Sequence, residues 1–242
     1  MVPTYAPPQV RRRRRWPWVL LVVLLVLVGL AVTADRIALS VAEDRAASAL
    51  QSSQGLNHKP DVTVEGFPFL TQLIAGSFGE VVVSANDVTV GQAHELQINQ
   101  VVVDLHDVTV PSDYSSVHAD TATARGSIGY DALSRLLGTE VRAGSGGRLI
   151  AEPSVHILGQ KFTGTVSAVV HASSANGLSF DNPKVSVNGV NVPPVVARLL
   201  ARVFERSISL AGLPFHVQVT GVDVTPDALV IKLAGHDLTY RR

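Results

Sequence analysis

The sequence has no cysteine among its 242 residues, and charged residues make up only 17% of it. Without thiols the chain cannot form disulfides, thiolate zinc sites, thiol nucleophiles or iron–sulfur clusters, and it cannot carry a lipid on an N-terminal cysteine. Aromatic residues are also few, at 5%, whereas 46% of the residues are apolar. Glycine and proline occur at ordinary levels, so neither a disordered nor a collagen-like chain fits. A chain of this length can bury a sizeable core without cross-links.

The formal net charge of zero hides an uneven distribution of charge. Residues 1–34 contain five arginines, Arg11–Arg15, and no acidic residue, so they carry +5. Residues 35–242 hold the other 15 of the 20 basic residues and all 20 acidic ones, so they carry −5. An acidic body lacks the basic face that nucleic-acid binding needs, and no nucleic-acid partner is expected.

The N-terminal segment has the features of a membrane-targeting sequence. Arg11–Arg15 precede two tryptophans, Trp16 and Trp18, and an apolar run follows from Val19 to Val32. The five arginines on the N-terminal flank of this run predict a cytoplasmic N-terminus. The 14-residue run fits the core of a signal peptide, whereas the 19 residues Trp16–Ala34 are long enough to span a bilayer. We expect an uncleaved signal-anchor; the alternative is a signal peptide cleaved after the small residues at its end.

These features predict three parts: a Pro- and Arg-rich cytoplasmic tail at 1–15, a transmembrane signal-anchor or signal peptide at 16–34, and an extracytoplasmic domain at 35–242. The predicted location is the cell membrane, crossed once with the N-terminus in the cytoplasm. If the signal is cleaved, the domain is released into the cell envelope.

Beyond the apolar run, a helix gives way to strands. Apolar residues recur every three or four positions from Asp35 to Gln54, and Gly55 follows as a helix stop. Apolar and polar residues then alternate, as in half-buried strands, at residues 62–65, 80–90, 101–106, 119–128, 155–171, 184–190, 215–220 and 229–234. Turn residues separate the runs, at Gly146-Gly147, Asn176-Gly177, Asn188-Gly189 and Thr225-Pro226-Asp227.

Two further helices are predicted within the strand-rich region. The first covers Tyr130–Leu137 and ends at a glycine, and the second runs from Pro193 to about Leu210. Three arginines, Arg198, Arg202 and Arg206, recur every four residues along one face of the second. This row is either a solvated face or a contact for phosphate headgroups near a membrane.

The order of these elements indicates an α+β protein. We expect a strongly curved antiparallel sheet wrapped around one or two long amphipathic helices, preceded by the N-terminal hydrophobic helix. Uninterrupted alternation gives a sheet one apolar face, which a helix, a second sheet or a ligand must cover.

The sequence offers no catalytic, metal-binding or cofactor motif. The nucleophile elbow, the paired-histidine zinc motif and the phosphate loop are all missing. Asp104 and His106 share one face of a strand, but a site there would need partners from elsewhere. Glu43 and Asp44 are neighbours on a helix and point about 100° apart, so they do not form a carboxylate pair. We therefore expect no catalytic residues, no metal, no cofactor and no enzyme activity.

The densest local signal is the segment from Gly66 to Gly76. Two of the seven phenylalanines, Phe67 and Phe69, flank Pro68 here. Three further apolar residues fit a helix of one or two turns closed by Gly76; they are Leu70, Leu73 and Ile74. Either this segment is a corner at which the aromatic rings plug the core, or the rings line the mouth of an apolar cavity.

This segment also carries a family resemblance. The stretch that begins at Pro60 resembles the actinobacterial LmeA-like family of phospholipid-binding cell-envelope proteins; it reads PDVTVEGFPFLTQLIAGSFGEVVVSANDVTV. The resemblance continues through VHADTATARGSIGYDALSRLL and LPFHVQVTGVDVTPDALVIKLAGHDL, over roughly residues 35–240. It implies the tubular lipid-binding fold of bactericidal permeability-increasing proteins, in which a curved sheet wraps a long helix around a lipid-sized groove.

The resemblance also implies a function. We expect a membrane-tethered, extracytoplasmic protein that binds phospholipid, with lipid transfer as an extension, and that supports maintenance of envelope lipids or lipoglycans. Its expected partners are phospholipid and the cytoplasmic membrane. The family offers no catalytic residues. The candidates for the apolar groove are Phe67, Phe69, Leu70 and Leu73, and those for the headgroup are Arg198, Arg202 and Arg206. The alternative function is a ligand-free envelope scaffold or sensor acting through protein contacts.

Overall fold

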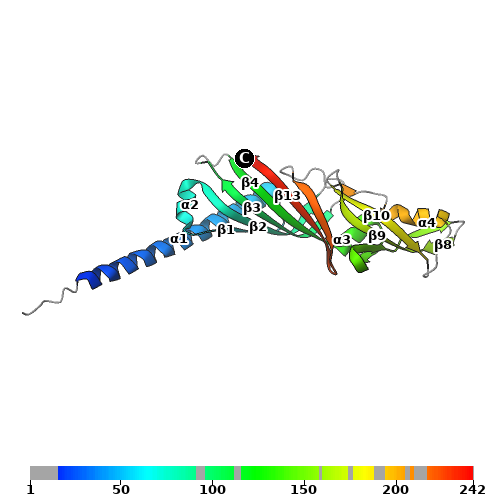
Figure 1. Cartoon of the computed structure of the whole chain (residues 1–242), viewed down its shortest axis with the longest axis horizontal. Coiled ribbons are helices and arrows are strands. Elements are labelled where there is room, and N and C mark those ends of the chain that lie inside the picture. The colour runs from blue at the N-terminus through cyan, green and yellow to red at the C-terminus, as the bar shows by residue number, and fades with distance from the viewer. Residues whose placement is uncertain are drawn as a thin grey trace, which may run out of the picture.

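The computed structural model describes residues 16–90, 96–111, 116–157, 160–173, 177–187, 194–204, 208–209 and 217–241. A long helix projects from one end of an elongated body, and two antiparallel sheets follow one another along that body (Figure 1). The predicted α+β class, with an apolar N-terminal helix and antiparallel sheets, is confirmed, and the curved sheets do not close into a tube.

The first helix, α1, runs without a break from Trp16 to Gln54. Its first half is uniformly apolar and exposed, and by length and composition it can cross a membrane. From Asp35 onward the pattern changes, because Asp35, Leu39 and Ala47 are buried against the body. Gly55 ends the helix with a φ of 61°, as the sequence predicts.

The larger sheet has six strands in the order β1-β2-β3-β4-β13-β12, and all neighbours are antiparallel. Four of its strands have 14 residues, and three of these, β2, β3 and β4, follow one another in the chain. The helix α1 contacts the sheet at its β1 edge. The strands are β1 (Asp61–Glu65), β2 (Ser77–Val90), β3 (Leu96–Thr109), β4 (Ser116–Gly129), β12 (Gln218–Val224) and β13 (Ala228–Arg241).

The second sheet has five strands in the order β11-β10-β9-β6-β5, with a separate hairpin formed by β7 and β8. One core cluster joins residues of both sheets, and β12 contacts β9. These strands are β5 (Val141–Ala143), β6 (Arg148–Ala151), β7 (Ser154–Ile157), β8 (Gln160–Thr163), β9 (Thr165–Ser173), β10 (Gly177–Ser186) and β11 (Ile208–Ser209).

Two short helices form where the sequence predicts them. The helix α2 covers Phe69–Ala75, and α3 covers Tyr130–Leu137. Each is followed by a glycine in the left-handed conformation, Gly76 with φ 66° and Gly138 with φ 68°. A residue without a Cβ adopts this conformation at little cost, which is why glycine ends both helices.

The helix predicted from Pro193 to about Leu210 is too long. The α-helix α4 covers only Pro194–Ala201, and a 3-10 turn, η2, follows at Arg202–Phe204. Leu200 and Phe204 are buried, and the Phe204 ring lies 4.9 Å from that of Phe180 on β10. Ile208–Ser209 then pair with β10 as β11, so the sheet edge takes residues that the apolar periodicity assigned to the helix.

The strand run predicted at residues 155–171 is also divided. The chain forms the β7–β8 hairpin first and then turns into β9 at Gly164. A Cβ at Gly164 would lie 2.6 Å from Leu200 Cδ1, so the turn packs tightly under α4. The tips at Gly146-Gly147 and Thr225-Pro226-Asp227 join neighbouring strands as expected, whereas Asn188-Gly189 lies outside the described residues.

Candidate functional site: an apolar sheet face and a helix junction

The six-stranded sheet has one apolar face and one polar face. Its register places Val83, Val103, Ala124 and Leu233 side by side on β2, β3, β4 and β13. Successive side chains of a strand point to opposite faces. The other face therefore carries the polar rows, such as Ser84–Val102–Arg125–Lys232 and Glu80–His106–Thr121–His236.

Bends in the long strands keep this apolar face continuous. Asp107 on β3 has a φ of 52°, and the ladder passes from the Glu80–His106 pair to the Phe78–Val108 pair without pairing it. Leu105 and Val108 are three residues apart, yet both belong to one core cluster. Aspartate is among the residues that tolerate the left-handed conformation, and a residue in this conformation can reverse the alternation of a strand. Asp237 on β13, with the same φ, makes the equivalent bend beside Ala119 on β4.

Two packed clusters occupy the ends of the apolar face. The cluster nearer α2 contains Val108, Ala119, Ala122 and Leu238. The larger cluster, centred on Ile98, Ile128 and the second sheet, fills the other end.

Between the clusters lies a row that we call the middle row: Val83, Val103 and Ala124. Within the part of the chain that the structure describes, these three residues belong to neither cluster, and each stays partly exposed. A row of partly exposed aliphatic side chains gains stability when an apolar group covers it. The middle row is therefore the candidate surface for an apolar ligand on this sheet.

The residues predicted to line the groove divide between core and surface. Phe69 is 1% exposed, and its ring stacks on Phe78 with a centroid distance of 6.2 Å. Leu70 is partly buried. Phe67 is 59% exposed and Leu73 is 37% exposed. One short segment thus supplies both a core plug and an exposed apolar surface.

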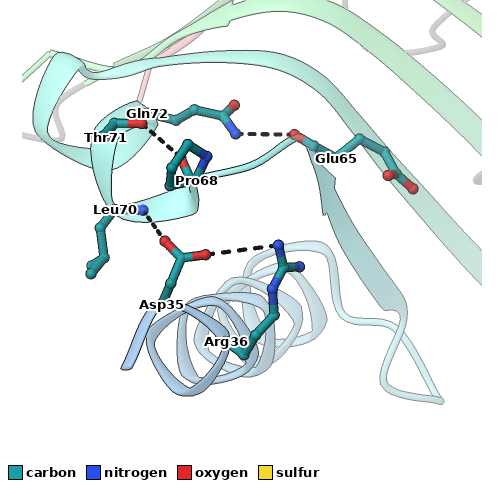
Figure 2. Close-up of polar contacts among 7 residues, drawn as sticks. All are labelled: Asp35, Arg36, Glu65, Pro68, Leu70, Thr71 and Gln72. Atoms are coloured by element: carbon teal, nitrogen blue, oxygen red, sulfur yellow. Dashed lines mark hydrogen bonds and ion pairs between the residues drawn. The ribbon is translucent and has the colours of Figure 1, made fainter. Parts of the chain in front are cut away.

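A buried carboxylate fixes this segment to α1 (Figure 2). Asp35 is 3% exposed, and its Oδ1 accepts a hydrogen bond of 2.8 Å from the backbone N–H of Leu70. Pro68 precedes α2 and provides no side-chain cap, so Asp35 of α1 supplies the acceptor for the first turn of α2. The second oxygen, Oδ2, faces the Arg36 guanidinium at 3.8 Å. That guanidinium also lies 5.0 Å from the centre of the Phe67 ring, within the range of a cation–π contact.

Further contacts fix the conformation of the Gly66–Gly76 segment. The Thr71 hydroxyl donates to the Pro68 carbonyl at 2.8 Å, and the Gln72 side chain donates to the Glu65 carbonyl at 3.3 Å (Figure 2). Gly66 has a φ of 105°, and a Cβ there would lie 2.6 Å from the Gln72 side chain. At the end of α2, Val110 N–H donates to the Gly76 carbonyl at 2.8 Å, which joins α2 to the chain after β3.

The arginines proposed for headgroup binding are not near this segment. Arg198 and Arg202 are exposed on α4 and η2, and α4 lies at the opposite end of the molecule from α2 (Figure 1). Arg206 lies outside the described residues. The structure therefore does not bring Arg198 and Arg202 together with Phe67 and Phe69.

Several polar side chains of the described ranges make contacts that hold the fold together. Within these ranges no group of three or more His, Asp or Glu residues is arranged to hold a metal ion. Glu43 accepts the Val64 N–H at 2.9 Å, which ties α1 to β1. Burial, with a smaller contribution from Asp227, raises the pKa of Tyr130. The Tyr130 hydroxyl donates to the Thr225 and Ala228 carbonyls and so closes the β12–β13 turn.

The middle row and the Asp35 contact are site features that sequence reasoning did not single out. The strand alternation placed Val103 on an apolar face, but only the packing shows which part of the face stays open. One feature of the sequence could have pointed to Asp35: it is the first acidic residue after the apolar run.

Fold and site together define a class: a β-rich body whose apolar sheet face is partly exposed, fixed to a hydrophobic helix. A family model described as LmeA-like phospholipid-binding matches residues 33–234. The chain belongs to this family, as the resemblance implied, and the membership supports lipid binding by this chain. The comparisons found no match among curated proteins and none among solved structures.

Proposed function

We propose that this protein is a membrane-tethered, extracytoplasmic phospholipid carrier that holds an acyl chain against the middle row of the six-stranded sheet. The observation that carries this proposal is the middle row itself, a band of partly exposed aliphatic residues between two packed clusters. Family membership supplies the chemical class of the ligand.

The energetics favour exchange over tight storage. Each methylene removed from water gains about 0.8 kcal/mol, but a lipid in a bilayer already has most of this stabilisation. A carrier therefore has to offer a comparable apolar surface, so that transfer is nearly neutral. A sheet that curves without closing leaves a side through which a lipid can enter and leave.

The tether follows from α1 and the charges before it. Trp16–Ala34 covers about 28 Å at 1.5 Å per residue, close to the roughly 30 Å hydrocarbon core of a bilayer. The helix continues from this segment into the residues that contact β1 and α2, which supports a retained anchor. The five arginines at 11–15 orient the body away from the cytoplasm. In this position the carrier serves maintenance of envelope lipids or lipoglycans.

Photo-crosslinking tests the proposal. The full chain is reconstituted into vesicles containing phosphatidylglycerol with a diazirine in its acyl chain, irradiated and mapped by peptide mass spectrometry. We expect adducts in β3 and β4 in addition to those in α1. Val103→Glu places a charge on the middle row and should remove the strand adducts.

Val102→Glu is the matched control, because the adjacent side chain lies on the polar face beside Ser84 and Arg125. This variant should keep the strand adducts. Wild-type adducts confined to residues 16–34 would contradict the carrier and favour the ligand-free scaffold.

A further inference from the structure

The Gly66–Gly76 segment exposes large apolar side chains to solvent. Ile74 is 87% exposed, Phe67 is 59% exposed and Leu73 is 37% exposed. We call Phe67, Leu73 and Ile74 the foot. Phe69, in the same segment, is the buried residue that fixes the foot to the sheet through Phe78.

The position of the foot is set by α1. The Asp35–Leu70 hydrogen bond joins α2 to the residue that directly follows the apolar segment Trp16–Ala34. That segment is about as long as a bilayer core is thick. With Trp16 and Trp18 at the inner boundary, Asp35 lies at the outer boundary, and α2 lies beside it (Figure 1).

We infer that the foot inserts into the outer leaflet of the membrane that α1 crosses. This inference rests on the proposed tether. Exposed apolar side chains of α1 extend past Asp35, since Ile37 is 59% exposed. A long arginine side chain near the end of a membrane helix can keep its charge among the headgroups, and Arg36 lies over Phe67 with its side chain half exposed. Asp35 is then a positioning residue: it holds α2 at the depth where the foot meets lipid.

Site-specific labelling tests the foot, and the absence of cysteine makes single-cysteine variants straightforward. An NBD fluorophore is attached to the full chain at Ile74→Cys, Leu25→Cys or Val195→Cys, in vesicles of phosphatidylcholine and phosphatidylglycerol. Val195 is 67% exposed on α4 at the far end and is the matched exposed control. We expect the Ile74 label to emit at shorter wavelength than the Val195 label and to be quenched by nitroxides near the headgroup.

The Leu25 label separates the foot from the tether. If Leu25 is shielded and quenched by deep nitroxides while Ile74 behaves like Val195, the foot is refuted and the tether stands; a protein then becomes the candidate occupant. If the Leu25 label is exposed to water, both the tether and the foot are refuted.

Asp35 variants test the positioning role with the same readout. Asp35→Ala removes the acceptor for the Leu70 N–H, so the Ile74 label should lose headgroup quenching while the Leu25 label keeps its own. Asp35→Asn retains a side-chain oxygen and should preserve most of the quenching at Ile74. Equal quenching in Asp35→Ala and the wild type would refute the positioning role.

Discussion

Replacing Phe69 by alanine should destabilise the protein far more than the same change at Phe67, although the two residues flank one proline. Phe69 is 1% exposed and stacked on Phe78, so its removal loses apolar burial and leaves a cavity. Such changes cost about 3–5 kcal/mol. Phe67 is 59% exposed, and its main described contact is with Arg36, worth about 0.5–1 kcal/mol at an exposed site.

Thermal unfolding of the full chain in detergent micelles, followed by circular dichroism, measures the difference. At this chain length each kcal/mol shifts the melting temperature by about 2–4 °C, so Phe69→Ala should lower it by roughly 6–20 °C. Phe67→Ala should lower it by no more than about 4 °C. Equal shifts for the two variants would refute the division of the segment into a core plug and an exposed foot. Loss of lipid crosslinking in Phe67→Asp at an unchanged melting temperature would assign Phe67 to lipid contact.

Two further predictions concern other parts of the body. Because folding raises the pKa of Tyr130, the folded state keeps its proton above pH 10, where the unfolded chain ionises. This contribution to stability is complete below that pH and is lost as the pH rises further; Tyr130→Phe should flatten the loss in unfolding experiments from pH 9 to 11. Replacing Arg198 and Arg202 together by glutamine should weaken capture of anionic vesicles by the nanodisc-held protein about fivefold per arginine in low salt. Unchanged capture would show that neither Arg198 nor Arg202 contacts lipid headgroups.

The two short helices α2 and α3 could be predicted because the residues that end them are neighbours in the sequence. The limits of α3 follow from a few consecutive residues, with Gly138 ending Tyr130–Leu137. The same holds for α2 and Gly76. In both cases the left-handed cap depends on one residue type at one position, so distant contacts do not compete with it.

Elements whose limits depend on distant partners could not be predicted. Ile208 fits the apolar periodicity of a helix, but its backbone pairs with Leu178 on β10 and forms β11. The break at Gly164 depends on Leu200, which lies 36 positions later in the chain. The partial exposure of the middle row could not be predicted either. Alternation places Val103 on an apolar face whether or not another element covers that face.

The two groups predicted to contact lipid, the Gly66–Gly76 segment and the arginines of α4 and η2, lie at opposite ends of the body. Asp35, Glu43 and Gly76 connect α1, α2, β1 and the end of β3, so the direction of α1 fixes the direction of the sheet. The long axis of the body continues away from the end at which α1 projects, and α4 lies at its far end (Figure 1). In the proposed orientation the foot lies at the membrane of the tether, whereas α4 and η2, which carry the exposed Arg198 and Arg202, lie at the far end of the body. The capture experiment with a second vesicle therefore tests the arginines in the geometry that the fold imposes.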